Sequence, residues 1–186
     1  MNGLGLGATK STATTTVTTM GQTDTKTLLP GNYFNSYNVE GGFLTFTAAQ
    51  SAGGQGGWLK IQFPNTNQSN ISGVSRADAV DAHEAQSGFK YKITFDIFLE
   101  TAGNWTEGAG NTQVTTKVNF GNVTSSFEVT PDQSVSIDTG VKTITANNQN
   151  NLLIFFNTAN DLPEARAVFY LKNFVLQTGQ DSSGFS

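Results

Sequence analysis

The sequence predicts an all-β protein: a two-sheet antiparallel β-sandwich of the jelly-roll type, with one short helix and an extended N-terminal arm. Three observations support this fold class. Thr (26), Gly (20), Asn (18) and Ser (14) make up 78 of the 186 residues, and these types favour turns or tolerate strands. Short apolar segments recur between clusters of Gly, Asn, Pro and Ser. Only one segment has the composition of a helix, so two packed sheets are the expected architecture.

The chain begins with a low-complexity arm, residues 1–29, which holds ten of the 26 threonines. The arm has no alternation of apolar and polar residues, so alone it could not offset the entropy lost on ordering. Threonine favours strands, and we therefore expect the arm to add as a strand to the sheet edge of a neighbouring subunit. The residues expected to make this assembly contact are Leu4, Leu6, Thr14, Thr16, Val17, Thr18 and Met20.

The jelly-roll domain is expected at residues 30–178, followed by a C-terminal tail at 179–186. The predicted strands are 43–47, 58–63, 89–99, 114–120, 123–129, part of 135–145, 152–156 and 167–176. Alternation in the third strand places one set of side chains in the core: Phe89, Tyr91, Ile93, Phe95, Ile97 and Leu99. Residues 152–156 and 168–176 are apolar on both faces, which predicts central strands. Alanines at 75–85, after Ser75 as N-cap, predict the helix.

Residues 87–97, Ser-Gly-Phe-Lys-Tyr-Lys-Ile-Thr-Phe-Asp-Ile, resemble the G-x-x-Y-x-ϕ-x-F-x-ϕ strand (ϕ apolar) of carbohydrate-binding-module-like jelly rolls with the galactose-binding-like fold. Residues 167–176 look like the closing strand of that family, and 57–61 like its early core strand. The resemblance spans residues 33–178 and implies a fold rather than a ligand. Such proteins often hold a structural calcium ion. Lys172-Asn173 stands where their closing strand usually has an acidic residue, which disfavours that ion here.

Charge and composition exclude several function classes. The net charge is −4, which argues against binding to nucleic acid or to an anionic membrane surface. With no cysteine and one histidine, the usual zinc and iron–sulfur ligand sets cannot form. The first seven residues lack the basic and apolar regions of a signal peptide, and no apolar stretch is long enough to span a membrane. We expect no cofactor and no metal.

Titratable side chains give no catalytic pattern. His83 lies in the predicted helix without a partner motif, so we expect it to face solvent. Asp78, Asp81 and Glu84 could share one side of that helix, but calcium sites usually need loop carbonyl oxygens as well. Neither Asp96 with Glu100 nor Asp132 with Asp138 has a spacing that brings two carboxylates to catalytic separation. The protein is therefore predicted not to be an enzyme.

Aromatic residues beside polar ones suggest sugar binding, because a sugar ring stacks on an aromatic face while amides and charged groups bond its hydroxyls. Trp58 alternates with Lys60 and Gln62, opposite the core residues of the same strand, so it should be covered by a neighbouring subunit, by the arm or by a glycan. The candidates for binding a glycan or a partner are Trp58, Lys60, Gln62, Trp105, Tyr33 and Tyr37.

Two functions follow from these patterns. The first is a structural protein of a bacteriophage virion, a capsid decoration (cement) protein or a tail or fibre component. It would form homo-oligomers, bind the major capsid or tail protein through its arm, and assemble in the host cytoplasm. The composition of an extracellular β-domain without a signal peptide favours this hypothesis. The alternative is a carbohydrate-binding module, acting as an adhesin or receptor-binding domain on a surface glycan. Removing the arm should abolish assembly under the first and leave sugar affinity intact under the second.

Overall fold

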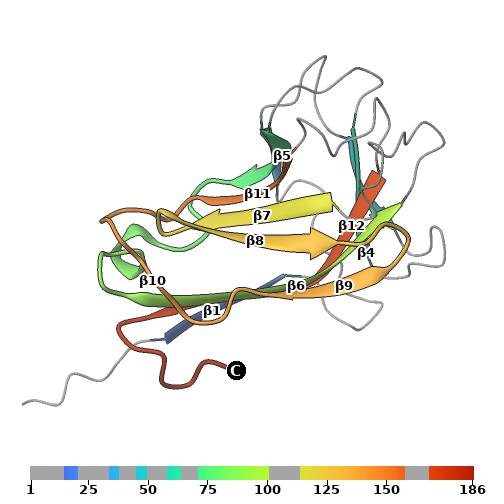
Figure 1. Cartoon of the computed structure of the whole chain (residues 1–186). Helices are drawn as coiled ribbons and strands as arrows, with labels where there is room; N and C mark the ends of the chain where they lie inside the picture. Colours follow the sequence, from blue (N-terminus) through green and yellow to red (C-terminus); the bar gives the residue numbers. More distant parts are fainter. Residues whose placement is uncertain are drawn as a thin grey trace, which may run out of the picture.

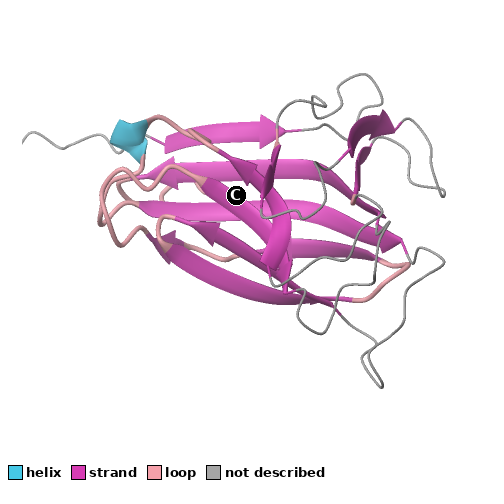
Figure 2. Ribbon diagram, turned by 90° about the horizontal axis from the view of Figure 1, so that it is seen from above, coloured by secondary structure: helices cyan, strands magenta, loops and turns pink. Residues whose placement is uncertain are grey.

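Two antiparallel β-sheets stack face to face, which confirms the predicted β-sandwich (Figure 1). The structure is a computed structural model that describes residues 15–20, 34–37, 45–49, 58–63, 71–100, 114–157 and 168–186. Seen from above, the strands run side by side and the single helical turn lies at one end of the sandwich (Figure 2). Among these residues, no helix has the length and apolar character needed to cross a membrane.

The first sheet has seven strands: β1 (Thr15–Met20), β3 (Thr45–Ala49), β4 (Trp58–Gln62), β6 (Lys90–Glu100), β9 (Ser134–Asp138), β10 (Lys142–Thr143) and β12 (Val168–Gly179). β12 is central, as its two apolar faces predicted. β6 pairs along one edge of β12, while β4 and β1 share the other edge. β9 and β10 pair with the far edge of β6, and β3 pairs with β4.

The second sheet has five strands in the order β2 (Asn35–Tyr37), β5 (Ile71–Arg76), β11 (Leu152–Asn157), β7 (Val114–Phe120) and β8 (Val123–Val129). β11 is central here, again as its apolar composition predicted. A two-residue turn joins β7 to β8, and Gly121 and Asn122 both have a left-handed φ of 61°. Residues of these types tolerate that conformation, so the sequence itself sets the register of this hairpin.

The core lies between the sheets and is filled mainly by aromatic and branched side chains. The predicted inward face of β6 is buried, from Tyr91 at 1% exposure to Leu99 at 0%, while Phe89, just before the strand, is partly buried against the core. Phe95 stacks on Phe174 of β12 with 5.6 Å between the ring centroids, and Tyr91 meets Phe120 of β7 edge-on at 5.1 Å. The contact between Tyr91 and Phe120 therefore joins β6 to the second sheet across the core.

The N-terminal arm contributes β1, and β1 pairs with β12 of its own chain (Figure 1). Thr16, Val17, Thr18 and Met20 thus pair within their own chain, and their contact with a neighbouring subunit stays a prediction. β4 covers only Val168–Leu171 of the twelve-residue β12, so the backbone groups of the second half need another partner along that edge. A segment of the same chain meets this need without the loss of freedom that association costs. Leu4, Leu6 and Thr14 lie outside the described residues.

The predicted helix at 75–85 is wrong. Ser75 belongs to β5, and the helical structure is a single 3₁₀ turn, Ala82–Glu84. β5 pairs with β2 as far as Ser75 and with β11 as far as Arg76, and this pairing overrides the local helix propensity of the alanines. Asp78 then adopts a left-handed φ of 50°, and Ala79 and Ala85 are buried against the core. The boundaries proposed for the arm, the domain and the tail stay a prediction.

Alkaline conditions are expected to destabilise the fold through Tyr91. Burial raises the pKa of Tyr91 to about 12, above its ordinary value of 10.0. Because the folded pKa is raised, the stability that comes from the neutral phenol is fully present below pH 10 and is lost as the pH rises towards 12. We predict that Tyr91→Phe loses less stability than the wild type over that window. Urea denaturation at neutral and alkaline pH measures this, and equal losses in the two proteins would contradict it.

Candidate functional site

The outward surface of the five-stranded sheet carries an aromatic pair among polar side chains, and we call this surface the Tyr37 face. β7 shows how the strands divide their side chains: Val118 and its inward neighbours are buried, whereas Lys117 and Asn119 are partly exposed on the outside. The pairing register extends this division to all five strands. The Tyr37 face consists of Asn35, Tyr37, Gly73, Ser75, Thr115, Lys117, Asn119, Thr124, Ser126, Glu128, Leu153 and Phe155.

One row of the Tyr37 face crosses all five strands. In register, Tyr37 lies opposite Gly73, Gly73 opposite Phe155, Phe155 opposite Lys117, and Lys117 opposite Ser126. The rings of Tyr37 and Phe155 lie 6.2 Å apart between centroids and are tilted by 43°. These residues stand on strands separated by β5. Gly73, which lies between them on β5, has no side chain, so the two rings can approach each other across that strand.

The neighbouring row is mostly polar. Asn35, Ser75, Leu153, Asn119 and Thr124 follow one another across the same strands. The Asn119 amide donates to the Thr124 hydroxyl at 2.7 Å. At the far end of β7, the Thr115 hydroxyl donates to Glu128 at 3.1 Å. Amide and hydroxyl groups therefore border the aromatic pair on a sheet that fixes their positions.

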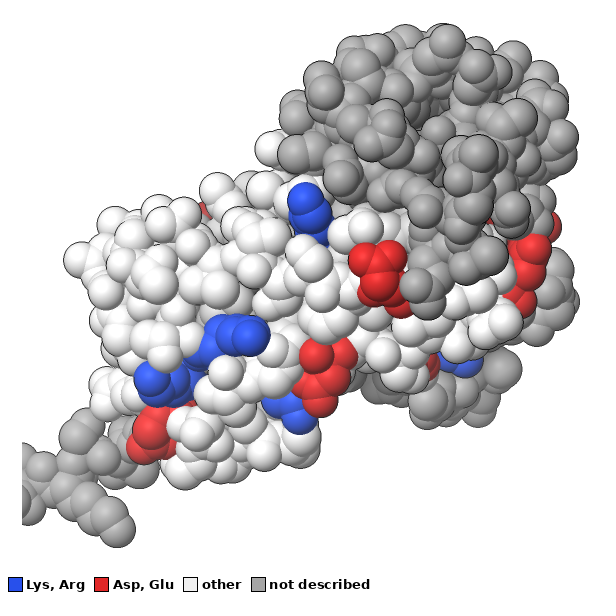
Figure 3. All heavy atoms as spheres, viewed as in Figure 1, with Lys and Arg blue, Asp and Glu red and all other residues white. Residues whose placement is uncertain are grey.

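Charge on the Tyr37 face is sparse, since Lys117 and Glu128 are its charged residues. Figure 3 likewise shows charges of both signs scattered among uncharged residues in the described part of this view. An aromatic surface with flanking hydroxyls and amides suits a neutral ligand with an apolar ring face and several hydroxyls. Hydrolysis of a glycoside normally uses two carboxylates, and the residues named on this face supply one.

Among the predicted binding residues whose side chains the structure describes, Tyr37 lies apart from Lys60 and Gln62. Tyr37 lies on the five-stranded sheet, whereas Lys60 and Gln62 lie on β4 of the seven-stranded sheet, opposite Tyr170 and Val168. They are partly exposed, and the residues that alternate with them are buried, as the pattern of this strand predicted. Trp58 begins β4 and its backbone pairs with Ala49. The side chain of Trp58, like all of Tyr33 and Trp105, lies outside the described residues.

Sequence reasoning missed Phe155 and Lys117 as members of the site. The run at 152–156 gave no sign of which apolar residue faces outward, because both of its faces are apolar. Lys117 alternates with buried residues of β7, which does mark it as outward. What the sequence could not show is that Lys117 neighbours Phe155, because that pairing joins strands far apart in the chain.

A hydrophobic cluster of Phe98, Val168 and Tyr170 lies on the outer side of the seven-stranded sheet and is nearly fully buried. The Tyr170 hydroxyl donates to Glu100 at 2.8 Å. Burial, and then this hydrogen bond and the nearby negative charge, raise the pKa of Tyr170 to about 12. Asp96, four residues before Glu100 on β6, accepts hydrogen bonds from Ser136 and Asn173. The two carboxylates considered as a pair in the sequence are thus each bonded to different neighbours.

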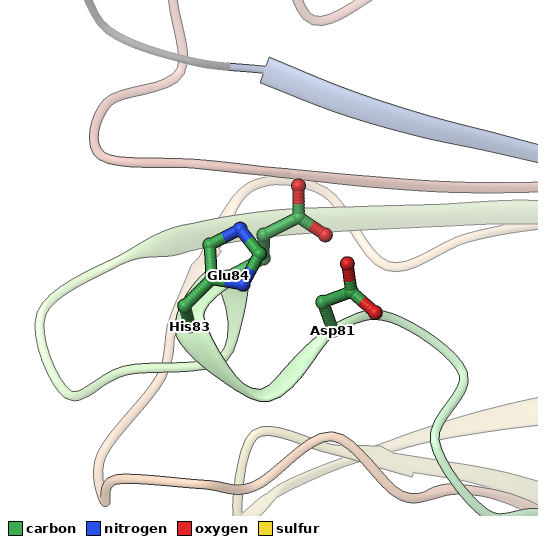
Figure 4. Close-up of side chains that lie close together, drawn as sticks. All are labelled: Asp81, His83 and Glu84. Carbon is green, nitrogen blue, oxygen red and sulfur yellow. The ribbon is translucent and has the colours of Figure 1, made fainter.

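The 3₁₀ turn brings together Asp81, His83 and Glu84, whose candidate ligand atoms lie within 4.8 Å of one another (Figure 4). Asp81 and His83 are exposed and Glu84 is partly exposed. Asp78, which the predicted helix placed with Asp81 and Glu84, instead accepts a hydrogen bond from Asn150 at 2.9 Å. His83 is exposed, as predicted. A small group of exposed titratable side chains does not by itself define a metal site.

Comparisons with known proteins concern the fold. No protein-family model matches the sequence, and no curated protein matches it. Among solved structures, the chain is similar to the arabinose-bound α-L-arabinofuranosidase MgGH51, with a TM-score of 0.50 and 13% identity. This match covers 77% of the chain and 23% of the enzyme, so the chain corresponds to about a quarter of that protein. The C-terminal family 22 carbohydrate-binding module of Clostridium thermocellum Xyn10B matches with a TM-score of 0.47 and 13% identity, covering 78% of the chain and 84% of the module.

At 13% identity, the similarity to the MgGH51 structure shows a shared fold and not a shared ligand. Nothing in the structure or in these comparisons supports the virion hypothesis. β1, which lies in the threonine-rich arm, pairs with β12 of its own chain. Self-association and any partner chain stay predictions.

Proposed function

We propose that this protein is a carbohydrate-binding domain and that the Tyr37 face holds a neutral glycan chain. The observation that carries the proposal is the Tyr37–Phe155 aromatic pair, which lies across Gly73 on a rigid sheet and is bordered by polar side chains. It makes concrete the carbohydrate-binding alternative that the sequence suggested.

The aromatic pair supplies the apolar part of recognition. Tyr37 is partly exposed, whereas Phe155 is only 8% exposed, so Tyr37 offers the ring surface and Phe155 supports it from the side. Sugar rings present an apolar C–H face that stacks on such a ring. The support matters because a side chain already held in place loses little entropy when the ligand binds.

The polar groups determine the direction in which a glycan chain would lie on the sheet. Four interstrand spacings of roughly 4.8 Å separate β2 from β8, so the row from Tyr37 to Ser126 extends about 19 Å, room for several linked sugar units. Lys117 can donate to sugar hydroxyls beside Phe155, and Asn119 and Ser126 can donate or accept. This arrangement favours a linear chain that lies across the strands.

Tyr37→Ala is expected to weaken glycan binding about tenfold or more, because it removes the stacking surface. The measurement is affinity gel electrophoresis against soluble xylan, arabinoxylan, mixed-linkage β-glucan and galactomannan, followed by calorimetry with the polysaccharide that retards the wild type most. Tyr37→Phe keeps the ring and should retain most of the affinity.

Lys60→Ala is the matched control, because Lys60 lies on the opposite sheet and should not contribute. If no polysaccharide retards the wild type, or if Tyr37→Ala binds as tightly as the wild type, the Tyr37 face is not the glycan site.

A further inference from the structure

The seven-stranded sheet has a pocket of its own, on the side of the molecule opposite the Tyr37 face. It has a volume of about 320 Å³ and lies between β6, β9 and the irregular part of β12. Its lining is Thr94, Phe95, Asp96, Ser136, Ile137, Asp138 and Asn173. Phe95 and Ile137 are core residues, so the groups available to a ligand are hydroxyls, an amide and carboxylates. The volume lies at the small end of the range of roughly 300–1,000 Å³ for ligand pockets.

Asp96 organises the pocket. One carboxylate oxygen accepts from the Ser136 hydroxyl at 2.6 Å, and the other accepts from the Asn173 amide at 2.7 Å. Asn173 reaches Asp96 because the ladder between β6 and β12 shifts register between Lys172 and Val175, where Asn173 adopts a left-handed φ of 54°. The two hydrogen bonds hold three polar side chains from three strands in one arrangement.

The charges around the pocket are balanced. Lys92 forms an ion pair with Asp138 at 3.3 Å, and Lys172 is the register partner of Asp96. Both oxygens of Asp96 already accept hydrogen bonds, and an oxygen of Asp138 accepts from the backbone of Gly140 at 2.7 Å. Carboxylates that are paired and bonded in this way favour a neutral ligand rich in hydroxyls over a bare cation.

One acceptor in the pocket has no partner. The carbonyl oxygen of the Asn173 side chain is buried and accepts no hydrogen bond. A buried acceptor without a donor destabilises the unliganded protein, and a hydroxyl donor that reaches it after a small side-chain shift would remove that penalty. Thr94 supplies a further hydroxyl at the pocket wall.

We propose that this pocket is a second carbohydrate site, which binds one sugar unit through its hydroxyls. The site goes beyond the proposed function, because it uses the opposite sheet and no residue of the Tyr37 face. With two sites on opposite sides, one molecule would bridge two glycan chains, or an internal and a terminal part of the same glycan.

The test is an NMR titration of the isotopically labelled full chain with D-glucose, D-galactose, D-mannose, D-xylose and L-arabinose at millimolar concentrations. At least one sugar should shift the backbone amides of Thr94, Ser136 and Asn173 in a saturable way. Thr94→Val and Ser136→Ala should each weaken that binding about tenfold, since each removes one hydroxyl. Both substitutions keep side chains that strands accept, and thermal melts check that the variants fold.

Thr124→Val is the matched control, because it removes a hydroxyl from the Tyr37 face and should leave the affinity of the pocket unchanged. The proposal is overturned if none of these sugars moves the three amides, or if neither pocket variant weakens the response. Because Tyr37→Ala should affect only the Tyr37 face, failure of one site can be told apart from failure of the other.

Discussion

Replacing Phe95 with alanine is expected to destabilise the fold by about 3–5 kcal/mol, because it leaves a large cavity at the centre of the core. Phe95 is 2% exposed and stacks on Phe174, which also meets Phe34 edge-on with 6.2 Å between the centroids. The cavity would therefore open between β6, β12 and the residue that leads into β2. Urea denaturation followed by circular dichroism measures the change.

Phe127→Ala is the matched control for this prediction, because Phe127 is only partly buried against the same core. The same chemical change should cost clearly less there. A Phe95→Ala protein with the denaturation midpoint of the wild type would mean that the inward face of β6 is assigned incorrectly.

Gly73→Ala is expected to destabilise the protein by about 3 kcal/mol, although it adds a single methyl group. A Cβ atom at Gly73 would overlap the carbonyl oxygen of Ile154 and lie 2.8 Å from the Cβ of Phe155. Backbone cannot yield as a flexible side chain can, so β5 and β11 would have to separate. The same separation would move Phe155 away from Tyr37, and the variant should lose glycan binding together with stability.

Gly140→Ala is the matched control, because it distinguishes the steric overlap at Gly73 from the general effect of replacing a glycine. Nothing lies within 4 Å of a Cβ at Gly140, but its φ of 62° is unfavourable for alanine, so a loss of about 1 kcal/mol is expected. Thermal melts compare the two variants. If Gly73→Ala is as stable as Gly140→Ala or more stable, the close approach between β5 and β11 at Gly73 is assigned incorrectly.

Strands with a clear local pattern could be predicted from the sequence. β7 and β8 occur at the predicted residues, and β6 is displaced by only one residue, because alternation and turn residues lie within each segment. β5 was not predicted, and its last two residues, Ser75 and Arg76, were assigned to the start of a helix. Its sequence, Ile-Ser-Gly-Val-Ser-Arg, has no regular alternation, and the pairing that makes it a strand comes from β2 and β11.

The candidate site could be predicted only in part, because the contacts between its residues also depend on pairing between distant strands. Tyr37 could be recognised as an aromatic residue among polar ones. Its partnership with Phe155 depends on Gly73 pairing with Phe155, a register that no local pattern encodes. In the arm, the threonines correctly predicted a strand, but the local sequence did not show which sheet edge it joins. In the structure, β1 pairs with β12 of the same chain.

The central claim is that a glycan lies across the Tyr37 face. It is tested most directly by a crystal structure of the full chain with an oligosaccharide derived from the polysaccharide that binds best. The account predicts a sugar ring stacked on Tyr37 and hydroxyls within hydrogen-bond distance of Lys117 or Asn119. An oligosaccharide bound elsewhere on the molecule, with Tyr37 and Phe155 uncontacted, would contradict it.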